Sequence, residues 1–444
     1  MKKNDFLDLT CTYLSNDAKG VCKTNDFCIY VDNLLPNEKC NAIVEGINGK
    51  TIYAKMLDLM EKSIDRVDVK CSSYTKCGSC KLLHLNYKKQ LEFKRNNVSL
   101  LFKNKGIKVN VKECIGMDEP FNYRNKVIAS VSYQNKKIVY GMYEENSHNV
   151  TYNKNCLIQN KTLNTILESI KEELDKLKIK PEGFGGVLRH IMLRIGIHTN
   201  EVLVVFVTNN DLFPGRNELV KNLTKKHKEI KTIIQNTNPR VTPIVFGNKD
   251  RILYGPGFIT DKLLGNSYKI SYRSFYQVNP IQTEKLYSKA IELAQLSKSD
   301  IVLDCYSGIG TISLSLAKSV KQVIGVEIVK DAVSDAINNA KHNNITNARF
   351  YTDDCKKFMN TYNGEIDTLF VDPPRSGLDN EFIKSVRRLK PKKIVYISCN
   401  PNTQVEDLYK LIDLYDIKEV VPVDMFPHTI HCENIVSLTL KASK

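Results

Sequence analysis

The chain has 444 residues, 42% of them hydrophobic, and its 65 Lys and Arg against 49 Asp and Glu give a net charge of +16. This length and hydrophobic content exclude a disordered chain and allow two or three domains. Because no run approaches the roughly 18 apolar residues of a membrane span, we expect a cytoplasmic protein with no membrane partner. The positive balance favours a polyanionic partner, most simply a nucleic acid, although a generally lysine-rich composition produces the same balance.

Residues 1–60 alternate short β-like segments with turn signals. Segments 27–31 and 51–54 are rich in β-branched and aromatic residues, and Asn16-Asp17 is typical of a turn. We therefore expect residues 1–60 to form a small all-β barrel.

The segment 81–140 carries a local excess of positive charge. It holds 13 Lys and Arg against 4 Asp and Glu, a difference of +9. Aromatic side chains and an arginine are interleaved along it: Phe93, Phe102, Tyr123, Arg124, Tyr133 and Tyr140. Because the unpaired bases of RNA stack on aromatic rings, this composition favours RNA among the polyanions.

Four cysteines form a second signal, in a central region of mixed pattern that we place at residues 61–265. Cys71, Cys77 and Cys80 lie close together beside a glycine, and Cys156 is available as a fourth ligand from a distant segment. Disulfides are unusual in a reducing cytoplasm, so a metal role is the natural alternative. Four thiolates suit tetrahedral zinc or an iron–sulfur cluster, and the wide first spacing favours a [4Fe-4S] cluster. Ordinary reduced cysteines are the remaining alternative.

From residue 266 onward, short apolar strands alternate with helical segments. The expected strands are 301–303, 322–326, 348–351, 368–371 and 394–397, and the expected helices are 312–318 and 331–343. This alternation predicts an α/β domain with a mostly parallel, doubly wound sheet. Ligands bind such sheets at the carboxyl ends of the strands.

A glycine-containing loop follows the first of these strands. Tyr306 and Gly308 lie in the loop, and Glu327 ends the next strand, where an acid can accept both hydroxyls of a ribose. Ser313 replaces the third glycine of a dinucleotide fingerprint, which disfavours NAD and favours S-adenosylmethionine (SAM), a cofactor with a ribose but no pyrophosphate. Asp354, after the following strand, is placed to accept the adenine amino group. Helix capping explains each acid singly but not their recurrence after successive strands.

Two further strand ends carry candidate catalytic groups. Asp372 follows one strand and is fixed by two prolines, and the neighbouring Arg375 can meet an anion. An acid before Pro-Pro at this position indicates a methyltransferase, with a rigid capping loop as the alternative. Cys399 follows the next strand, and Glu433 comes about thirty residues later in a turn rich in proline and histidine. A nucleophile and a base can meet there.

Five motifs, in this order, resemble those of the RNA uracil-5 methyltransferase family. They are Phe275-Tyr276-Gln277-Val278-Asn279-Pro280, the Asp304-to-Gly310 loop, Asp372-Pro373-Pro374-Arg375-Ser376-Gly377, Ser398-Cys399-Asn400-Pro401 and Pro427-His428-Thr429-Ile430-His431-Cys432-Glu433. The resemblance implies a Rossmann-like class I SAM-dependent methyltransferase domain at 266–444. Residues 1–60 resemble a TRAM domain, an OB-like RNA-binding barrel, and the four-cysteine site at 61–265 resembles that of the [4Fe-4S]-bearing 23S ribosomal RNA branch.

The resemblance also implies roles for single residues. SAM is expected to contact Gln277, Tyr306, Gly308, Glu327, Asp354 and Asp372. A [4Fe-4S] cluster is expected to bind Cys71, Cys77, Cys80 and Cys156. Cys399 is expected to be the nucleophile and Glu433 the general base, while His428 and His431 shape the turn and Cys432 packs.

The expected reaction explains why a thiol and an acid are needed. Uracil C5 is a poor nucleophile, so a thiolate adds to C6 and makes C5 reactive, and a base later removes the C5 proton. Because only the thiolate attacks, we expect positive charge or hydrogen bonding around Cys399.

The predicted function is SAM-dependent methylation of uridine C5 in 23S rRNA by a monomer. The alternatives are a tRNA uracil-5 methyltransferase, an amino-group methyltransferase acting on adenine or guanine without a cysteine, an iron–sulfur electron-transfer protein and a non-catalytic iron–sulfur RNA-binding protein.

Overall fold

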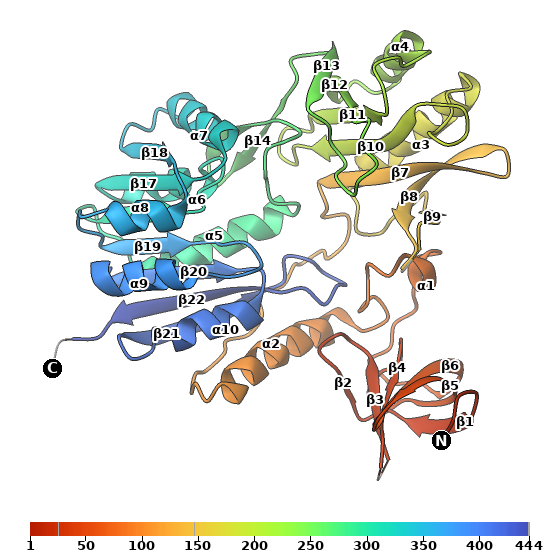
Figure 1. The fold of residues 1–444 in the computed structure, drawn as a ribbon, viewed down its shortest axis with the longest axis horizontal. Helices are drawn as coiled ribbons and strands as arrows, with labels where there is room; N and C mark the ends of the chain where they lie inside the picture. Colours follow the sequence, from red (N-terminus) through yellow and green to blue (C-terminus); the bar gives the residue numbers. More distant parts are fainter. Residues whose placement is uncertain (25, 146, 443–444) are drawn as a thin grey trace.

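The computed structural model describes residues 1–24, 26–145 and 147–442, and its strands gather into sheets that follow one another along the chain (Figure 1). The N-terminal sheet has the strand order β1-β5-β6-β4-β3-β2. Its strands are β1 Phe6–Thr10, β2 Tyr13–Leu14, β3 Gly20–Lys23, β4 Cys28–Val31, β5 Lys39–Asn48 and β6 Thr51–Glu61. Register irregularities between β5 and β6 help this sheet to curl around a core that includes Ile29 and Val44. The assignment of this unit as a TRAM domain stays a prediction.

Helices α1 (Tyr74–Cys77) and α2 (Tyr87–Asn104) separate this sheet from the next. Asn86 caps α2 by accepting a backbone N–H of the first turn at 3.0 Å. The sequence patterns above do not predict α2, because its buried face includes the polar Gln90 and Lys94.

The central sheet has the strand order β13-β12-β11-β10-β7-β8-β9. Its strands are β7 Lys126–Gln134, β8 Lys137–Tyr143, β9 Val150–Tyr152, β10 Leu188–Ile195, β11 Val202–Thr208, β12 Ile230–Thr237 and β13 Lys249–Tyr254. Helices α3 (Lys161–Lys176) and α4 (Arg216–Lys226) share a core with one face of this sheet. Residues of its other face, among them Met192 and Val205, belong to the same core as the hairpin of β14 (Ile259–Leu263) and β15 (Asn266–Ile270).

The C-terminal sheet has the order β18-β17-β16-β19-β20-β22-β21, in which β22 alone runs antiparallel to its neighbours. Its strands are β16 Ile301–Cys305, β17 Gln322–Glu327, β18 Ala348–Thr352, β19 Thr368–Val371, β20 Lys393–Ser398, β21 Tyr415–Val423 and β22 Glu433–Leu440. The helices around it are α5 Pro280–Ala294, α6 Thr311–Leu316 with the short 3-10 helix Ala317–Ser319, α7 Lys330–His342, α8 Cys355–Thr361, α9 Asn380–Leu389 and α10 Pro401–Tyr409. The predicted mostly parallel, doubly wound sheet is confirmed.

Helix α2 shares a core with this C-terminal sheet. Val98 and Phe102 pack in the same cluster as Leu303 of β16 and Val420 of β21. The chain after α2 then runs parallel to β21, with a bridge between Val111 and Val420. The domain limits expected from the sequence stay a prediction, but α2 does not belong to a core of the 61–265 segment alone.

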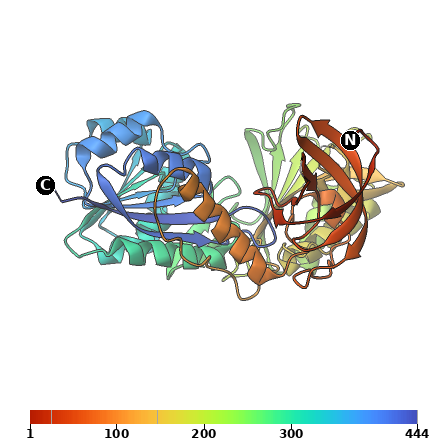
Figure 2. The ribbon, with the colours of Figure 1, turned by 90° about the horizontal axis from the view of Figure 1, so that it is seen from below.

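Figure 2 shows α2 lying between the N-terminal sheet and the C-terminal sheet. Burial corrects the expectation that aromatic residues of the 81–140 segment stack on RNA bases. Phe93, Phe102, Tyr123 and Tyr140 are all buried and cannot do so. They are apolar core residues in a basic segment. None of the described helices is long and apolar enough to cross a membrane.

Candidate active site

A tight loop joins β16 to α6 at the carboxyl edge of the C-terminal sheet. Tyr306, Gly308 and Gly310 have φ values of 66°, 54° and 82°, so the backbone makes left-handed turns at the strand end. The Gly308 N–H donates to Glu327 Oε2 at 3.1 Å, and Val329 N–H donates to Glu327 Oε1 at 2.9 Å. Glu327 is thereby fixed beside the loop.

Two acids lie at neighbouring strand ends beside this loop, the buried Asp304 and the half-buried Asp372. Asp304 of β16 accepts the Ser313 hydroxyl at 2.5 Å, and Asp372 follows β19, which pairs with β16. Burial raises the pKa of Asp304 to about 7, and burial together with the Asp304 charge raises the pKa of Asp372 to about 7. Among the described residues, Asp304 Oδ1 and Ser307 Oγ are buried without a hydrogen-bond partner. Unpaired buried polar atoms of this kind suit a site that receives a polar ligand.

The two remaining acceptor residues expected for the cofactor differ in their surroundings. Gln277 lies beside Tyr287 of α5. Burial, and then the charge of the nearby Asp372, raises the pKa of Tyr287, whereas a hydrogen bond with Gln277 lowers it. Asp354 instead caps α8, where its Oδ1 accepts the Lys356 N–H at 2.9 Å. Asp354 therefore has the capping role that the sequence left as an alternative.

Cys399 lies one residue beyond β20, where Asn400 caps α10 and ends the strand. The half-buried thiol lines a cavity of about 220 Å³. The walls of this cavity come from separate parts of the chain, including Asn16 of the N-terminal sheet, Lys94 and Asn97 of α2, Arg375 and His431. The sequence motifs indicate the thiol, but not the contribution of Asn16 and α2.

The environment of Cys399 favours the thiol over the thiolate. Burial, and then the carboxyl groups of Glu433 and Asp372, raises the pKa of Cys399 to about 11, while Arg375 acts in the opposite direction. The expected positive charge is thus present as Arg375, but burial and the two carboxyl groups outweigh it.

Glu433 begins β22 and is 3% exposed. Burial, and then the charges of Asp372 and Cys432, raises the pKa of Glu433 well above its usual range, and Arg375 lowers it. The thiol and three acids, Cys399, Asp304, Asp372 and Glu433, therefore form one electrostatically coupled group at the edge of the sheet.

The 424–432 turn between β21 and β22 carries the chain to Glu433, and α2 anchors it. Lys94 Nζ lies 2.5 Å from Asp424 Oδ1, and both side chains are fully buried. The same ammonium donates to the Phe426 carbonyl at 3.1 Å, and Tyr87 donates to Asp424 Oδ2 at 2.8 Å. Gln90 Oε1 accepts the N–H of His428 at 2.9 Å. Lys94, Tyr87 and Gln90 all belong to α2.

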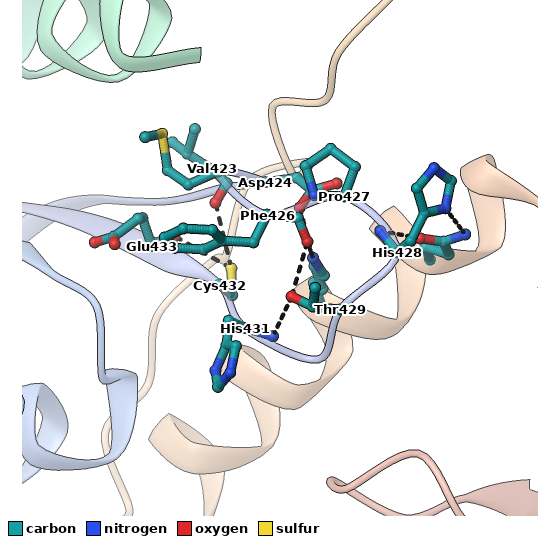
Figure 3. Close-up of polar contacts among 12 residues, drawn as sticks. Val423, Asp424, Phe426, Pro427, His428, Thr429, His431, Cys432 and Glu433 are labelled. Carbon is teal, nitrogen blue, oxygen red and sulfur yellow. Dashed lines mark hydrogen bonds and ion pairs between the residues drawn. The ribbon is translucent and has the colours of Figure 1, made fainter. Parts of the chain in front are cut away.

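Hydrogen bonds within the turn complete its shape. Thr429 Oγ1 donates to the Phe426 carbonyl at 2.8 Å and accepts the His431 N–H at 3.2 Å. Figure 3 shows His428 and Glu433 on opposite sides of the turn. Burial lowers the pKa of His428 to about 4, and Arg375 Nη2 donates to His431 Nδ1 at 3.1 Å. Both histidines thus act as hydrogen-bonding groups of the turn, and Cys432 is buried in the core.

The four predicted metal-binding cysteines lie around a second cavity. Cys71, Cys77, Cys80 and Cys156 line a space of about 330 Å³ together with Arg124 and Lys126. Burial, and then the nearby Cys156, Cys77 and Cys71, raises the pKa of Cys80 to about 12. Within residues 1–24, 26–145 and 147–442, no group of three or more Cys, His, Asp or Glu converges as the ligands of a single metal ion.

A parallel sheet with this strand order, a glycine-containing loop after its first strand and acids at successive strand ends define a nucleotide-cofactor α/β enzyme. A family model described as tRNA (uracil-5-)-methyltransferase matches residues 86–441. An uncharacterized RNA methyltransferase of Listeria innocua is 41% identical over 99% of each chain, and one of Clostridium tetani is 37% identical over 100% of this chain and 98% of its own.

Among solved structures, the Pyrococcus abyssi tRNA (uracil-54, C5)-methyltransferase in complex with S-adenosyl-L-homocysteine is similar to this chain. It is 30% identical, with a TM-score of 0.79 over 98% of this chain and 100% of its own. The chain belongs to the RNA uracil-5 methyltransferase family, and the resemblance seen in its motifs is confirmed. It is a SAM-dependent RNA methyltransferase.

The ion pair between α2 and the turn gives a stability prediction. Replacing Lys94 by methionine leaves the Asp424 carboxylate buried without its countercharge, so we expect Lys94→Met to lower the free energy of unfolding by about 3–5 kcal/mol in urea denaturation. Lys89→Met is the matched control on the same helix, because the Lys89–Glu92 pair is exposed and worth no more than about 1 kcal/mol. Equal stability of the two variants contradicts the anchoring role of Lys94.

Proposed function

We propose that this protein methylates C5 of a uridine in RNA through a covalent bond between Cys399 Sγ and uracil C6, with Glu433 as the general base. The observation that carries the proposal is the pairing of β20 with β22, in which Ser398 lies opposite Asn434, so that the half-buried Cys399 and the buried Glu433 lie side by side at the carboxyl edge of the sheet. An amino-group methyltransferase has no use for the thiol, and a non-catalytic RNA-binding protein has no use for either group. Membership of the uracil-5 family supports the same choice.

The residues of this chain account for the steps that follow loss of the Cys399 thiol proton to solvent. The Cys399 thiolate forms the S–C6 bond, and the electrons of the C5=C6 double bond move toward O4. SAM, when bound, supplies the methyl group to C5. Glu433 then accepts the C5 proton, the C5=C6 double bond forms again, and the S–C6 bond breaks to release Cys399. The raised pKa of Glu433 makes its carboxylate a stronger base for this step.

The residues that hold SAM in this proposal lie around the β16 loop. Glu327 receives the ribose hydroxyls, and Tyr306 and Gly308 form the loop beside it. Gln277 and Asp372 contact SAM on the side that faces Cys399 and Glu433. The unpaired Asp304 Oδ1 and Ser307 Oγ fit a polar ligand at this position. Asp354, whose Oδ1 caps α8, is also proposed to accept the adenine amino group of SAM.

Two substitutions separate the nucleophile from the base. We expect Cys399→Ala to abolish methylation and adduct formation, and Glu433→Gln to accumulate a covalent protein–RNA adduct because the C5 proton is not removed. The adduct is measured as a slowly migrating band on a denaturing gel. Cys28→Ala, which removes a half-buried thiol of the N-terminal sheet, is the control and should retain activity. Methylation by Cys399→Ala contradicts the mechanism.

The proposed substrate is 23S rRNA, on the resemblance of the cysteine site and N-terminal sheet to the ribosomal branch. A tRNA substrate is the second candidate, because the matching family and the similar Pyrococcus abyssi enzyme are described as acting on tRNA.

Mapping of 5-methyluridine decides between these substrates. We expect a 23S rRNA position to lose its methyl group when the gene is deleted and to regain it when the purified protein and SAM are added. Loss confined to tRNA identifies the second candidate instead, and no change in either RNA contradicts both.

We also include a [4Fe-4S] cluster held by Cys71, Cys77, Cys80 and Cys156 in the proposal. Zinc draws four sulfurs to about 2.3 Å from one atom, whereas a [4Fe-4S] cluster takes one cysteine on each of its irons and keeps the sulfurs apart. All four cysteines line one cavity of about 330 Å³, which supports a site for a group larger than a single ion. Arg124 and Lys126 at the same cavity offset the negative charge of the thiolates.

Metal analysis of anaerobically purified protein tests this assignment. We expect about four iron atoms and matching acid-labile sulfide per chain, and loss of both in Cys77→Ser, because each iron needs its cysteine. Cys22→Ser, in a buried position of the N-terminal sheet, is the control for loss of a thiol. One zinc and no sulfide per chain contradicts the cluster.

A further inference from the structure

The Cys399 cavity shares two wall residues with a larger, neighbouring cavity. A space of about 510 Å³ lies between α2 and the N-terminal sheet, and its walls include Tyr13, Asn97 and Leu100. Asn16 and Asn97 line both this space and the Cys399 cavity. The two spaces therefore adjoin at Asn16 of the 15–19 turn and Asn97 of α2.

The 15–19 turn is held firmly in this position. Ser15 Oγ accepts the Lys19 N–H at 3.0 Å, and Lys19 pairs with Asp32 at 2.7 Å. Ala18 packs in a buried cluster with Leu35 of the same sheet and Phe93 of α2, and Ile430 of the 424–432 turn packs against this cluster. Asn16 is exposed at the tip of a turn that is fixed both to α2 and to the turn that precedes Glu433.

The larger cavity has the size and the side chains to hold the base of a nucleotide, and its walls also carry Lys89 and the acids Asp65 and Glu92. A volume of about 510 Å³ lies within the roughly 300–1,000 Å³ range of small-molecule sites. Asparagine amides offer both donors and acceptors to the edges of bases, and exposed tyrosine rings offer a stacking face. Tyr13 is 43% exposed, and the Lys23 ammonium lies over its ring, 5.2 Å from the ring centre and outside the cavity walls.

We propose that the cavity between the 15–19 turn and α2 binds a nucleotide adjacent to the target uridine in the RNA strand. In this arrangement Asn16 and Asn97 select the base at the passage between the two cavities, and Tyr13 stacks on it. The inference rests on the proposed uridine methylation, because the strand must run from Cys399 into the second cavity. The N-terminal sheet thereby takes part in substrate selection directly beside the reacting base.

The test combines protein variants with abasic RNA. The probe is a synthetic RNA fragment around the mapped uridine, either intact or with one abasic nucleotide on the 5′ or 3′ side of that uridine. For the wild-type protein we expect an abasic nucleotide on one side to raise KM roughly tenfold, the size of one lost stacking contact, with kcat changed less than about twofold. Tyr13→Ala and Asn97→Ala should raise KM for the intact RNA by a similar factor and lose their sensitivity to that abasic site.

Tyr53→Ala is the matched control, because Tyr53 is 45% exposed on the same sheet and does not line either cavity. It should keep the wild-type KM and the wild-type sensitivity. If Tyr13→Ala and Asn97→Ala retain the full abasic effect while the wild-type protein forms 5-methyluridine, the subsite is refuted and the proposed function stands. If the wild-type protein forms no 5-methyluridine on any RNA, the proposed function itself fails.

Discussion

The buried ion pair between Lys94 and Asp424 is the constraint on which the arrangement of the site depends. A lysine and an aspartate with no exposed surface are stable only when they stay together, since either charge alone is strongly disfavoured in the interior. The pair fixes α2 against the 424–432 turn, and that turn leads directly into Glu433. The same face of α2 supplies Tyr87 and Gln90 to the turn, so one helix sets the position of the proposed base relative to the thiol.

A second constraint is the crowding of acids at the carboxyl edge of the sheet. Asp304, Asp372 and Glu433 are each held in surroundings that raise their pKa, and two of them raise the pKa of Cys399 in turn. Such a group of like charges is unfavourable by itself, and perturbed pKa values of this kind gather at functional sites. Arg375 is the cation that opposes these shifts at both Cys399 and Glu433. The proposed nucleophile is therefore kept as a thiol while these acids are ionised.

The strand-end residues could be predicted from the sequence because topology brings the carboxyl ends of parallel strands together whatever their distance along the chain. Glu327, Asp372 and Cys399 follow this rule. Asp354 lies at the same edge after β18, but there its side chain caps the next helix. The periodicity of α2 is hidden by Gln90 and Lys94, which are polar and yet buried because their partners come from residues some 330 positions later.

The position of Asn16 beside the Cys399 cavity could not be predicted from the sequence. The Asn16-Asp17 signal predicts a turn, but it does not predict which surface that turn contacts. The family match begins at residue 86, the cap of α2, so the helix lies within the matched region, while the N-terminal sheet and three of the four cysteines precede it. The 15–19 turn of this sheet nevertheless forms part of the wall of the Cys399 cavity. It packs against Phe93 of α2 and Ile430 of the 424–432 turn. A helix anchored by one buried ion pair thus holds both the proposed base and the wall that the N-terminal sheet adds to the Cys399 cavity.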